Sequence, residues 1–158
     1  MTVFLNKIKI EGINVSNLLN EEGSFDFNSI IYSPNQESNQ KKWGVKTNAS
    51  RAFVFGNNLF FITYERIPLP IVKALSETYK EKKITHSWAS DEIGCKVGKQ
   101  ELISGEIITD ISPEHLSQEA FDIYVSIWGD SQCLYKENNQ YKIKECIDCD
   151  GCCGAKKK

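Results

Sequence analysis

The sequence predicts an α+β fold of the split βαβ, or ferredoxin-like, type, in which two helices cover one face of an antiparallel sheet. Two apolar segments in residues 51–64, joined by Gly56-Asn57-Asn58, are typical of a β-hairpin. A helix opened by Pro68 and Pro70 follows, and Lys83–Ser90 returns to strand-like alternation. With one earlier strand and helix, the order becomes strand-helix-strand-strand-helix-strand, which is the order of that fold.

The first part of the chain supplies the earlier strand and helix. Val3–Ile10 alternates well enough for a strand, and the segment Asn14–Leu19 suggests a short helix that ends before Gly23. After Pro34, the polar residues Asn35–Lys42 predict a loop that could form a contact surface.

The carboxy-terminal part predicts further elements. Ile93–Ile111 is strand-like with a turn at Ser104-Gly105, and a helix is expected from Ser112-Pro113 to Gly129. Asn138-Asn139 lies between two short apolar segments and indicates a hairpin. We therefore divide the chain into a ferredoxin-like domain (1–111), a helix-hairpin extension packed on it (112–145) and a cysteine-rich tail (146–158).

The central strands carry apolar side chains on both alternating sets. Phe53 and Phe55 alternate with Ala52 and Val54, and the next strand has the same character. A sheet that is apolar on both sides needs cover on both sides. We expect the carboxy-terminal helix to supply the second cover.

Composition limits the function classes. The 158 residues include 19 basic and 21 acidic side chains, so no global positive field would attract nucleic acid or an anionic membrane. Arg51 and Arg66 are the only arginines, which disfavours a protein that reads DNA sequence. The sequence shows no signal peptide or membrane-spanning segment, so a cytoplasmic location, that of a bacterial host, is expected.

Several short motifs resemble, in order and spacing, the YubB-type ferredoxin-like family of phages and conjugative plasmids. They lie between about Asn6 and Ile108 and are Phe25-Asp26-Phe27-Asn28 with Pro34, Trp43-Gly44-Val45-Lys46 with Asn48, Thr63 leading into Pro68-Leu69-Pro70, and Asp91-Glu92-Ile93-Gly94. The resemblance implies a ferredoxin-like fold and a mobile-element origin. It brings no established catalytic residues.

Two features suggest site chemistry. Cys146, Cys149, Cys152 and Cys153 have spacing that could bind Zn(II), although four cysteines in eight residues leave little chain for a tetrahedral cage, and a thiol-rich tail without a cofactor is the alternative. His86, near Trp88 and Asp91, could act as a base, but a single strand histidine is more often packed or exposed. We therefore expect a protein that is not an enzyme.

Two hypotheses for function remain. The first is a phage or mobile-element protein that binds a host protein, such as a CRISPR effector or another defence complex, and inhibits it, with Trp43, Asp91 and Glu92 as the exposed contact residues. The alternative is a module that binds single-stranded nucleic acid or nucleotides on its sheet face. There Arg51, Phe53 and Phe55 partly resemble the aromatic strand of RNA-recognition motifs, although the overall charge disfavours this partner.

Overall fold

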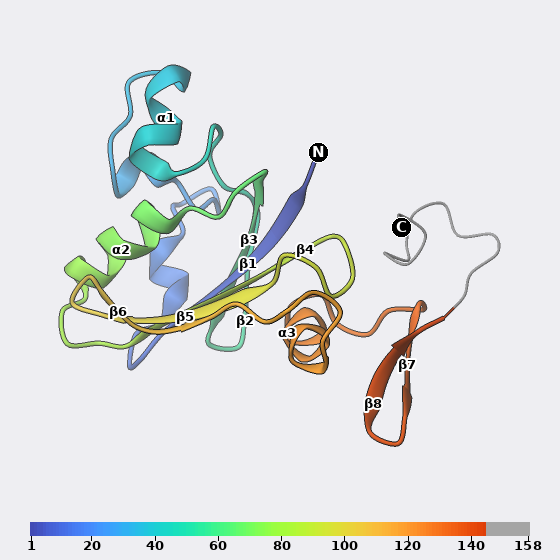
Figure 1. Cartoon of the computed structure of the whole chain (residues 1–158). Helices are drawn as coiled ribbons and strands as arrows, with labels where there is room; N and C mark the ends of the chain where they lie inside the picture. The colour runs from blue at the N-terminus through green and yellow to red at the C-terminus, as the bar shows by residue number, and fades with distance from the viewer. Residues whose placement is uncertain (145–158) are drawn as a thin grey trace.

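The computed structural model describes residues 1–144 and contains a six-stranded antiparallel sheet (Figure 1). The spatial order of the strands is β2-β3-β1-β4-β5-β6. The first four positions are those of the ferredoxin-like arrangement, so the predicted fold class is confirmed. The strands are β1 (Val3–Ile10), β2 (Ser50–Phe55), β3 (Asn58–Tyr64), β4 (Ile84–Ser90), β5 (Gly98–Ile103) and β6 (Glu106–Ile111).

Helices α1 and α2 lie on one side of this sheet (Figure 1). Helix α3 packs near one end of the sheet, against its opposite face. A two-stranded hairpin follows α3, as the sequence predicts around Asn138-Asn139. The remaining elements are the 3-10 helices η1 (Val15–Leu18) and η2 (Phe27–Ser29), the helices α1 (Gln36–Trp43), α2 (Leu69–Thr78) and α3 (Gln118–Trp128), and the strands β7 (Leu134–Glu137) and β8 (Gln140–Ile143).

The face of the sheet beneath α2, here called the helical face, carries the main core. Strand register places Ile8, Leu59 and Ile84 on this face, and burying each such side chain contributes roughly 1.5–3 kcal/mol. The buried cluster consists of Ile8, Ile10, Val15, Phe25, Phe27, Trp43, Val45, Leu59, Phe61, Ile71, Val72, Leu75, Ile84 and Leu102.

The opposite face, here called the open face, is covered only in part. Helix α3 packs over one end of it and forms a second core with Leu5, Phe60 and Ala89. At the β2 edge, however, Phe53 is 49% exposed and Phe55 is 75% exposed. The expectation that both faces are fully covered is therefore wrong, because α3 is too short and too far from β2 to reach that strand.

The segment predicted as a polar loop, Asn35–Lys42, forms most of α1. The Asn35 side chain accepts a hydrogen bond from the Ser38 N–H at 3.1 Å and caps the helix. Gly44 ends it in a left-handed conformation (φ 82°), where a Cβ would meet Pro70 at 2.9 Å. The prediction of a loop is therefore wrong, because the polar composition gave no apolar periodicity. The helix is stabilised by its caps and by Trp43, which packs into the core.

Helix α3 begins later than the Ser112-Pro113 start that the sequence predicts. Its first residue is Gln118, and the Ser117 hydroxyl caps it by accepting from the Ala120 N–H at 3.2 Å. Leu116 has a φ of 63° and donates its N–H to the Gly94 carbonyl at 2.8 Å. This tertiary hydrogen bond holds the chain out of helical geometry for one turn. Gly129 ends the helix as predicted.

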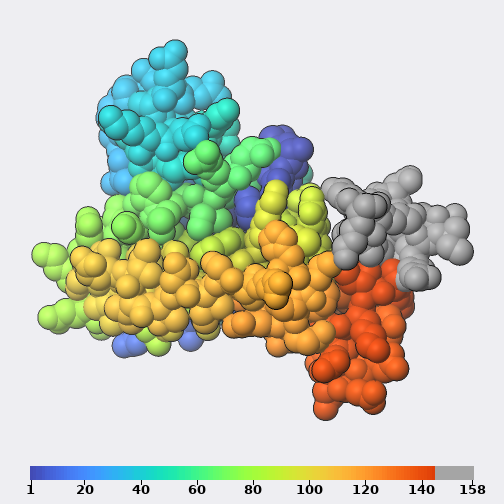
Figure 2. All heavy atoms as spheres, in the orientation of Figure 1, coloured from blue at the N-terminus to red at the C-terminus, as the bar shows by residue number. Residues whose placement is uncertain are grey.

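In the space-filling view, the segment around α1 rises as a lobe above the sheet and the β7–β8 hairpin projects at the opposite end (Figure 2). Gln118 ties the hairpin to α3, since its side-chain amide both donates to and accepts from the Tyr141 backbone, at 2.9 and 2.7 Å. Among residues 1–144, no helix combines the length and the apolarity needed to cross a membrane.

Candidate functional site

The uncovered part of the open face brings together three lysines and three phenylalanines. We call this group the lysine–aromatic patch, and it consists of Lys7, Lys9, Phe53, Phe55, Phe60 and Lys99. Period-two alternation places Lys7 and Lys9 on the same side of β1 as Leu5, facing away from α2. The patch thus combines residues from strands β1, β2, β3 and β5.

The aromatic rings of the patch are ordered by stacking. Phe53 lies opposite Phe60 in the strand register, and their rings are parallel, with centroids 5.0 Å apart and 6° between the planes. Phe60 itself is buried, whereas Phe53 and Phe55 present their outer surfaces to solvent. Parallel rings exposed on a sheet can stack planar groups at little conformational cost.

The lysines lie next to these rings. The Lys7 ammonium is 5.9 Å from the Phe60 ring centroid, within the range of a cation–π contact. Within residues 1–144, none of Lys7, Lys9 and Lys99 forms an ion pair with an acidic side chain; the nearest pair on this face joins Lys83 and Glu101 at 3.0 Å. The three ammonium groups are therefore available to an anionic ligand.

A shallow groove of about 470 Å³ runs between these lysines and α3. Hydroxyl and amide groups of Asn58, Thr85 and Ser87 line it and can donate hydrogen bonds. Asp122 and Ser126 of α3 form its far wall. The groove therefore has one acidic wall and a basic floor, and an anion would be held over the strands and not against the helix.

The pKa of Lys7 lies below its usual value. Partial burial is the main cause, and repulsion from Lys99 and then Lys9 adds to it. A site that crowds cations in this way favours ligands that bring negative charge, because an anion relieves both the repulsion and the loss of hydration.

Arg51, predicted with Phe53 and Phe55, lies at a β-bulge. The register shifts between the Ser50–Ile62 pair and the Phe53–Phe60 pair, and Arg51 has a φ of 51°. A bulge at an edge strand redirects side chains and blocks pairing with another strand. Arg51 is exposed beside the patch.

Trp43 is not an exposed contact residue. It is 3% exposed, its indole N–H donates to the Ile31 carbonyl at 2.7 Å, and its ring meets Phe27 edge to face at 5.6 Å. The expectation that it anchors a partner is wrong on this point, because α1 turns it inward.

Asp91 and Glu92 follow β4 at the end of the sheet where the neighbouring strand β1 begins. The exposed Asp91 accepts a hydrogen bond from the Val3 N–H at 3.4 Å and donates its own N–H to the Val3 carbonyl at 2.9 Å. Glu92 is half-buried and donates its N–H to the Ser90 hydroxyl at 3.2 Å. Because Trp43 is buried, the three residues do not form one exposed contact surface.

His86 lies inside the core and cannot meet a substrate. It is fully buried on the helical face, and desolvation lowers its pKa to about 3. Its Nε2 is 2.9 Å from the Asn6 Oδ1, and since that oxygen can only accept, Nε2 carries the proton. Asn6 in turn donates to the Thr63 hydroxyl at 2.9 Å, so His86 belongs to a structural network.

The cysteine cluster Cys146, Cys149, Cys152 and Cys153 lies outside the described residues. Among residues 1–144, no group of three or more histidine, cysteine and acidic side chains is placed to hold a metal ion.

The lysines of the patch are the residues that sequence reasoning missed. Their signal was the alternation of Lys7 and Lys9 with buried neighbours in β1, which shows that the strand has one polar face. Lys99 carried no such signal, because only the sheet order β1-β4-β5 places it near them.

Comparison with known proteins identifies a family whose model matches this chain. A family model described as a ferredoxin-like domain in Api92-like protein matches residues 42–146, about two thirds of the chain. The matched region contains the strands β2 to β6, the helices α2 and α3 and the β7–β8 hairpin, whereas strand β1 lies outside it. Searches of curated proteins and of solved structures found no match.

Proposed function

This chain belongs to the family of ferredoxin-like domains in Api92-like proteins, and from the open face of its sheet we propose that it binds single-stranded nucleic acid. The observation that carries the proposal is the lysine–aromatic patch, in which Phe53 stacks on Phe60 beside three lysines without acidic partners. Bases would stack on the exposed rings while the lysines contact phosphates.

The arrangement favours single strands over duplexes. Aromatic rings on a sheet surface stack on bases that are free of a partner strand, which a duplex does not offer. Only two arginines are present in the chain, so bidentate reading of base edges is not expected. Binding should therefore depend weakly on sequence.

The net charge of −2 does not oppose this function, because Lys7, Lys9 and Lys99 lie together in one groove and form a local positive region. It does limit affinity, since no long-range positive field steers the ligand. Three phosphate contacts on a single strand would give a slope of about −2 in a plot of log affinity against log salt.

The test is fluorescence anisotropy of labelled oligo(dT) and oligo(rU), repeated over a series of salt concentrations. Phe53→Ala should weaken binding about tenfold, since stacking on one ring contributes about 1–3 kcal/mol. Lys7→Gln should weaken it and reduce the salt slope by about 0.7. Tyr32→Ala and Lys73→Gln are matched controls, because both residues are exposed and lie away from the patch.

The outcomes separate the proposal from non-specific attraction. If Tyr32→Ala or Lys73→Gln lowers affinity as much as the patch variants, the patch is not the binding site. If the wild-type protein binds neither oligonucleotide at low salt, the proposal fails.

The YubB-type resemblance adds a second proposal, that the protein comes from a phage or plasmid and acts by binding a host defence protein. The observation that favours it is the exposed carboxylate of Asp91, which hydrogen bonds with Val3 fix at the end of the central strands. Charge reversal at Asp91 should then slow association with a basic partner, and salt should narrow the difference from wild type. Affinity capture from host lysate, compared between the wild-type protein and Asp91→Lys, tests this.

A further inference from the structure

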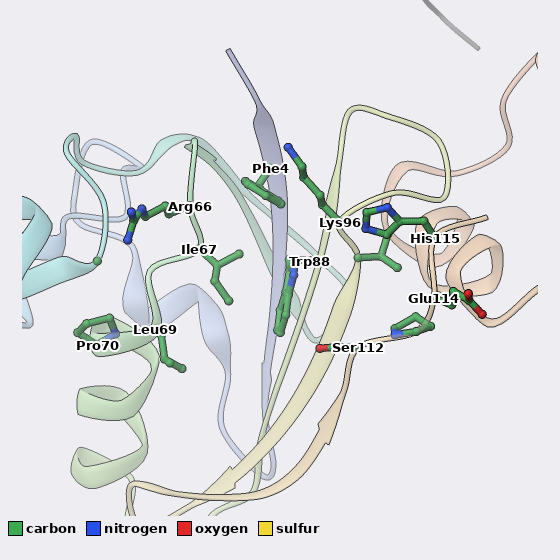
Figure 3. Close-up of a pocket in the computed structure, with 13 residues that line it drawn as sticks. Phe4, Arg66, Ile67, Leu69, Pro70, Trp88, Lys96, Ser112, Glu114 and His115 are labelled. Atoms are coloured by element: carbon green, nitrogen blue, oxygen red, sulfur yellow. The ribbon is translucent and has the colours of Figure 1, made fainter. Parts of the chain in front are cut away.

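A second concave site lies on the helical face, on the side of the sheet opposite to the lysine–aromatic patch. It is an open cleft of about 1100 Å³ between the start of α2 and the segment 112–115 that follows β6 (Figure 3). Trp88 of β4 and Phe4 of β1 line its centre. This cleft has no part in the proposed nucleic-acid site.

Trp88 differs from the other two tryptophans in what its indole N–H contacts. The N–H of Trp43 donates to the Ile31 carbonyl at 2.7 Å, and that of Trp128 donates to the Ser90 carbonyl at 2.9 Å. Trp88 is only 8% exposed, yet its N–H has no hydrogen bond with any residue among 1–144. Buried tryptophans usually satisfy this donor within the protein, and Trp88 differs from Trp43 and Trp128 in this respect.

The Trp88 nitrogen is directed into the cleft. The nitrogen has no hydrogen-bond partner within the described part of the chain but is not fully buried, so some of its surface remains accessible. Trp88 lines the cleft, and the nitrogen therefore reaches its open space. In Figure 3 it lies at the end of the ring nearer to Phe4 and Lys96. A ligand atom in the cleft could therefore accept its proton.

Packing fixes the indole in this orientation. Trp88 pairs with Gly98 of β5, and a Cβ at Gly98 would fall 2.2 Å from the indole Cζ2, so the ring occupies the space that any other side chain would fill. On its other side, the ring lies 5.0 Å from the His86 imidazole. The donor is thus held in place before any ligand arrives, which lowers the entropic cost of binding.

Basic and apolar side chains lie on both walls of the cleft. Lys96 and His115 lie together on one side of Trp88, and Arg66 lies on the opposite wall (Figure 3). Glu114 is the one acidic residue of the lining, and its carboxylate points away from Trp88 in this view. The apolar walls are formed by Ile67, Leu69, Pro70, Val97 and Pro113.

From this geometry we propose that the cleft binds a small organic anion with an apolar body. Its oxyanion, a carboxylate or a phosphate, accepts from the Trp88 N–H and pairs with the Lys96 ammonium, and its body packs against the apolar wall that begins at Leu69. Lys96 now donates to the exposed Thr2 hydroxyl at 3.3 Å, a weak contact that an oxyanion can replace.

The test follows the three indole N–H signals in ¹⁵N–¹H NMR spectra of the full chain. Phenyl phosphate and benzoate are the organic anions, and inorganic phosphate and benzyl alcohol each carry only half of the required chemistry. Either organic anion should shift the Trp88 signal in a saturable way and leave Trp43 and Trp128 unchanged. Inorganic phosphate and benzyl alcohol should each bind at least tenfold more weakly than the organic anions. Whichever of phenyl phosphate and benzoate binds more tightly shows whether the cleft prefers a phosphate or a carboxylate.

Variants then separate the roles of the two polar groups. Lys96→Gln should lower the affinity for the organic anion about tenfold, the loss expected for one charge-assisted hydrogen bond, without changing benzyl alcohol binding. Trp88→Phe keeps an aromatic ring, removes the N–H donor and assigns the Trp88 signal. Lys73→Gln, an exposed lysine of α2, is the matched control and should have no effect.

The proposal is overturned by any of three results: no saturable shift of the Trp88 signal, equal shifts of all three indoles, or equal losses in Lys96→Gln and Lys73→Gln. Lys96 is exposed, so its variant should fold, and the test does not depend on the stability of the Trp88 variant.

Discussion

The two faces of the sheet are built from the same strands but differ in how far they are covered. On the helical face, Phe61 is fully buried beneath a core that α2 and the α1 segment complete. On the open face, Phe53 remains 49% exposed, although it belongs to an equally apolar strand. The difference shows that aromatic residues in a strand do not reveal whether they stabilise the fold or remain for a ligand; the length and position of the covering helix decide that.

The first prediction contrasts the two faces directly. Phe61→Ala should reduce the free energy of unfolding by about 3–5 kcal/mol, because it leaves a cavity in a packed core. Phe53→Ala should cost about 1 kcal/mol or less, since half of its surface is already in water. Denaturant unfolding of both variants measures the two losses, and equal losses would contradict the distinction between the faces.

The second prediction concerns acid and the helical face. The unfolded chain protonates His86 below its ordinary pKa of 6.5, whereas the folded chain does so only near pH 3, so stability falls as the pH drops through this window. The loss between pH 6.5 and pH 4 is about 3 kcal/mol from this residue.

The measurement compares unfolding at several pH values in the wild type, in His86→Gln and in His115→Gln. His86→Gln keeps an amide donor for Asn6 and removes the titration, so its stability should decline less with acid. The exposed His115 serves as the control. If all three proteins lose stability in parallel, burial of neutral His86 is not the cause.

The third prediction tests the close approach of Gly98 and Trp88. Gly98→Ala should cost about 1–3 kcal/mol, because its Cβ would overlap the indole and force the ring to move. Thermal unfolding gives the loss, and the Trp88 indole signal should move while the Trp43 signal stays. An unchanged melting temperature would show that the ring is free to move.

The smallest effect is expected on the open face. Because the pKa of Lys7 is lowered in the folded protein, stability should rise slightly with pH from that lowered pKa up to the ordinary value of 10.5. Lys7→Gln should remove this dependence and leave stability at neutral pH unchanged or slightly higher, in contrast to its loss of nucleic-acid binding. Urea unfolding between pH 8 and pH 11 is the measurement.

The sequence alone determined the order of elements. Alternating apolar residues in Val3–Ile10 and in residues 51–64, the Pro-opened helix before Lys83–Ser90, and the turns at Ser104-Gly105 and Asn138-Asn139 are local signals, and local signals are sufficient to place strands and turns. They also indicated the two exposed phenylalanines, Phe53 and Phe55, as residues of interest.

Tertiary structure decided the rest, because burial depends on contacts between distant segments. Trp43 turns inward only because α1 forms from a polar sequence and packs on the core. Helix α3 begins late because Leu116 bonds to Gly94. Lys7, Lys9 and Lys99 become one site only through a sheet order that places β1 and β5 on either side of β4, and no pattern along the chain encodes that adjacency.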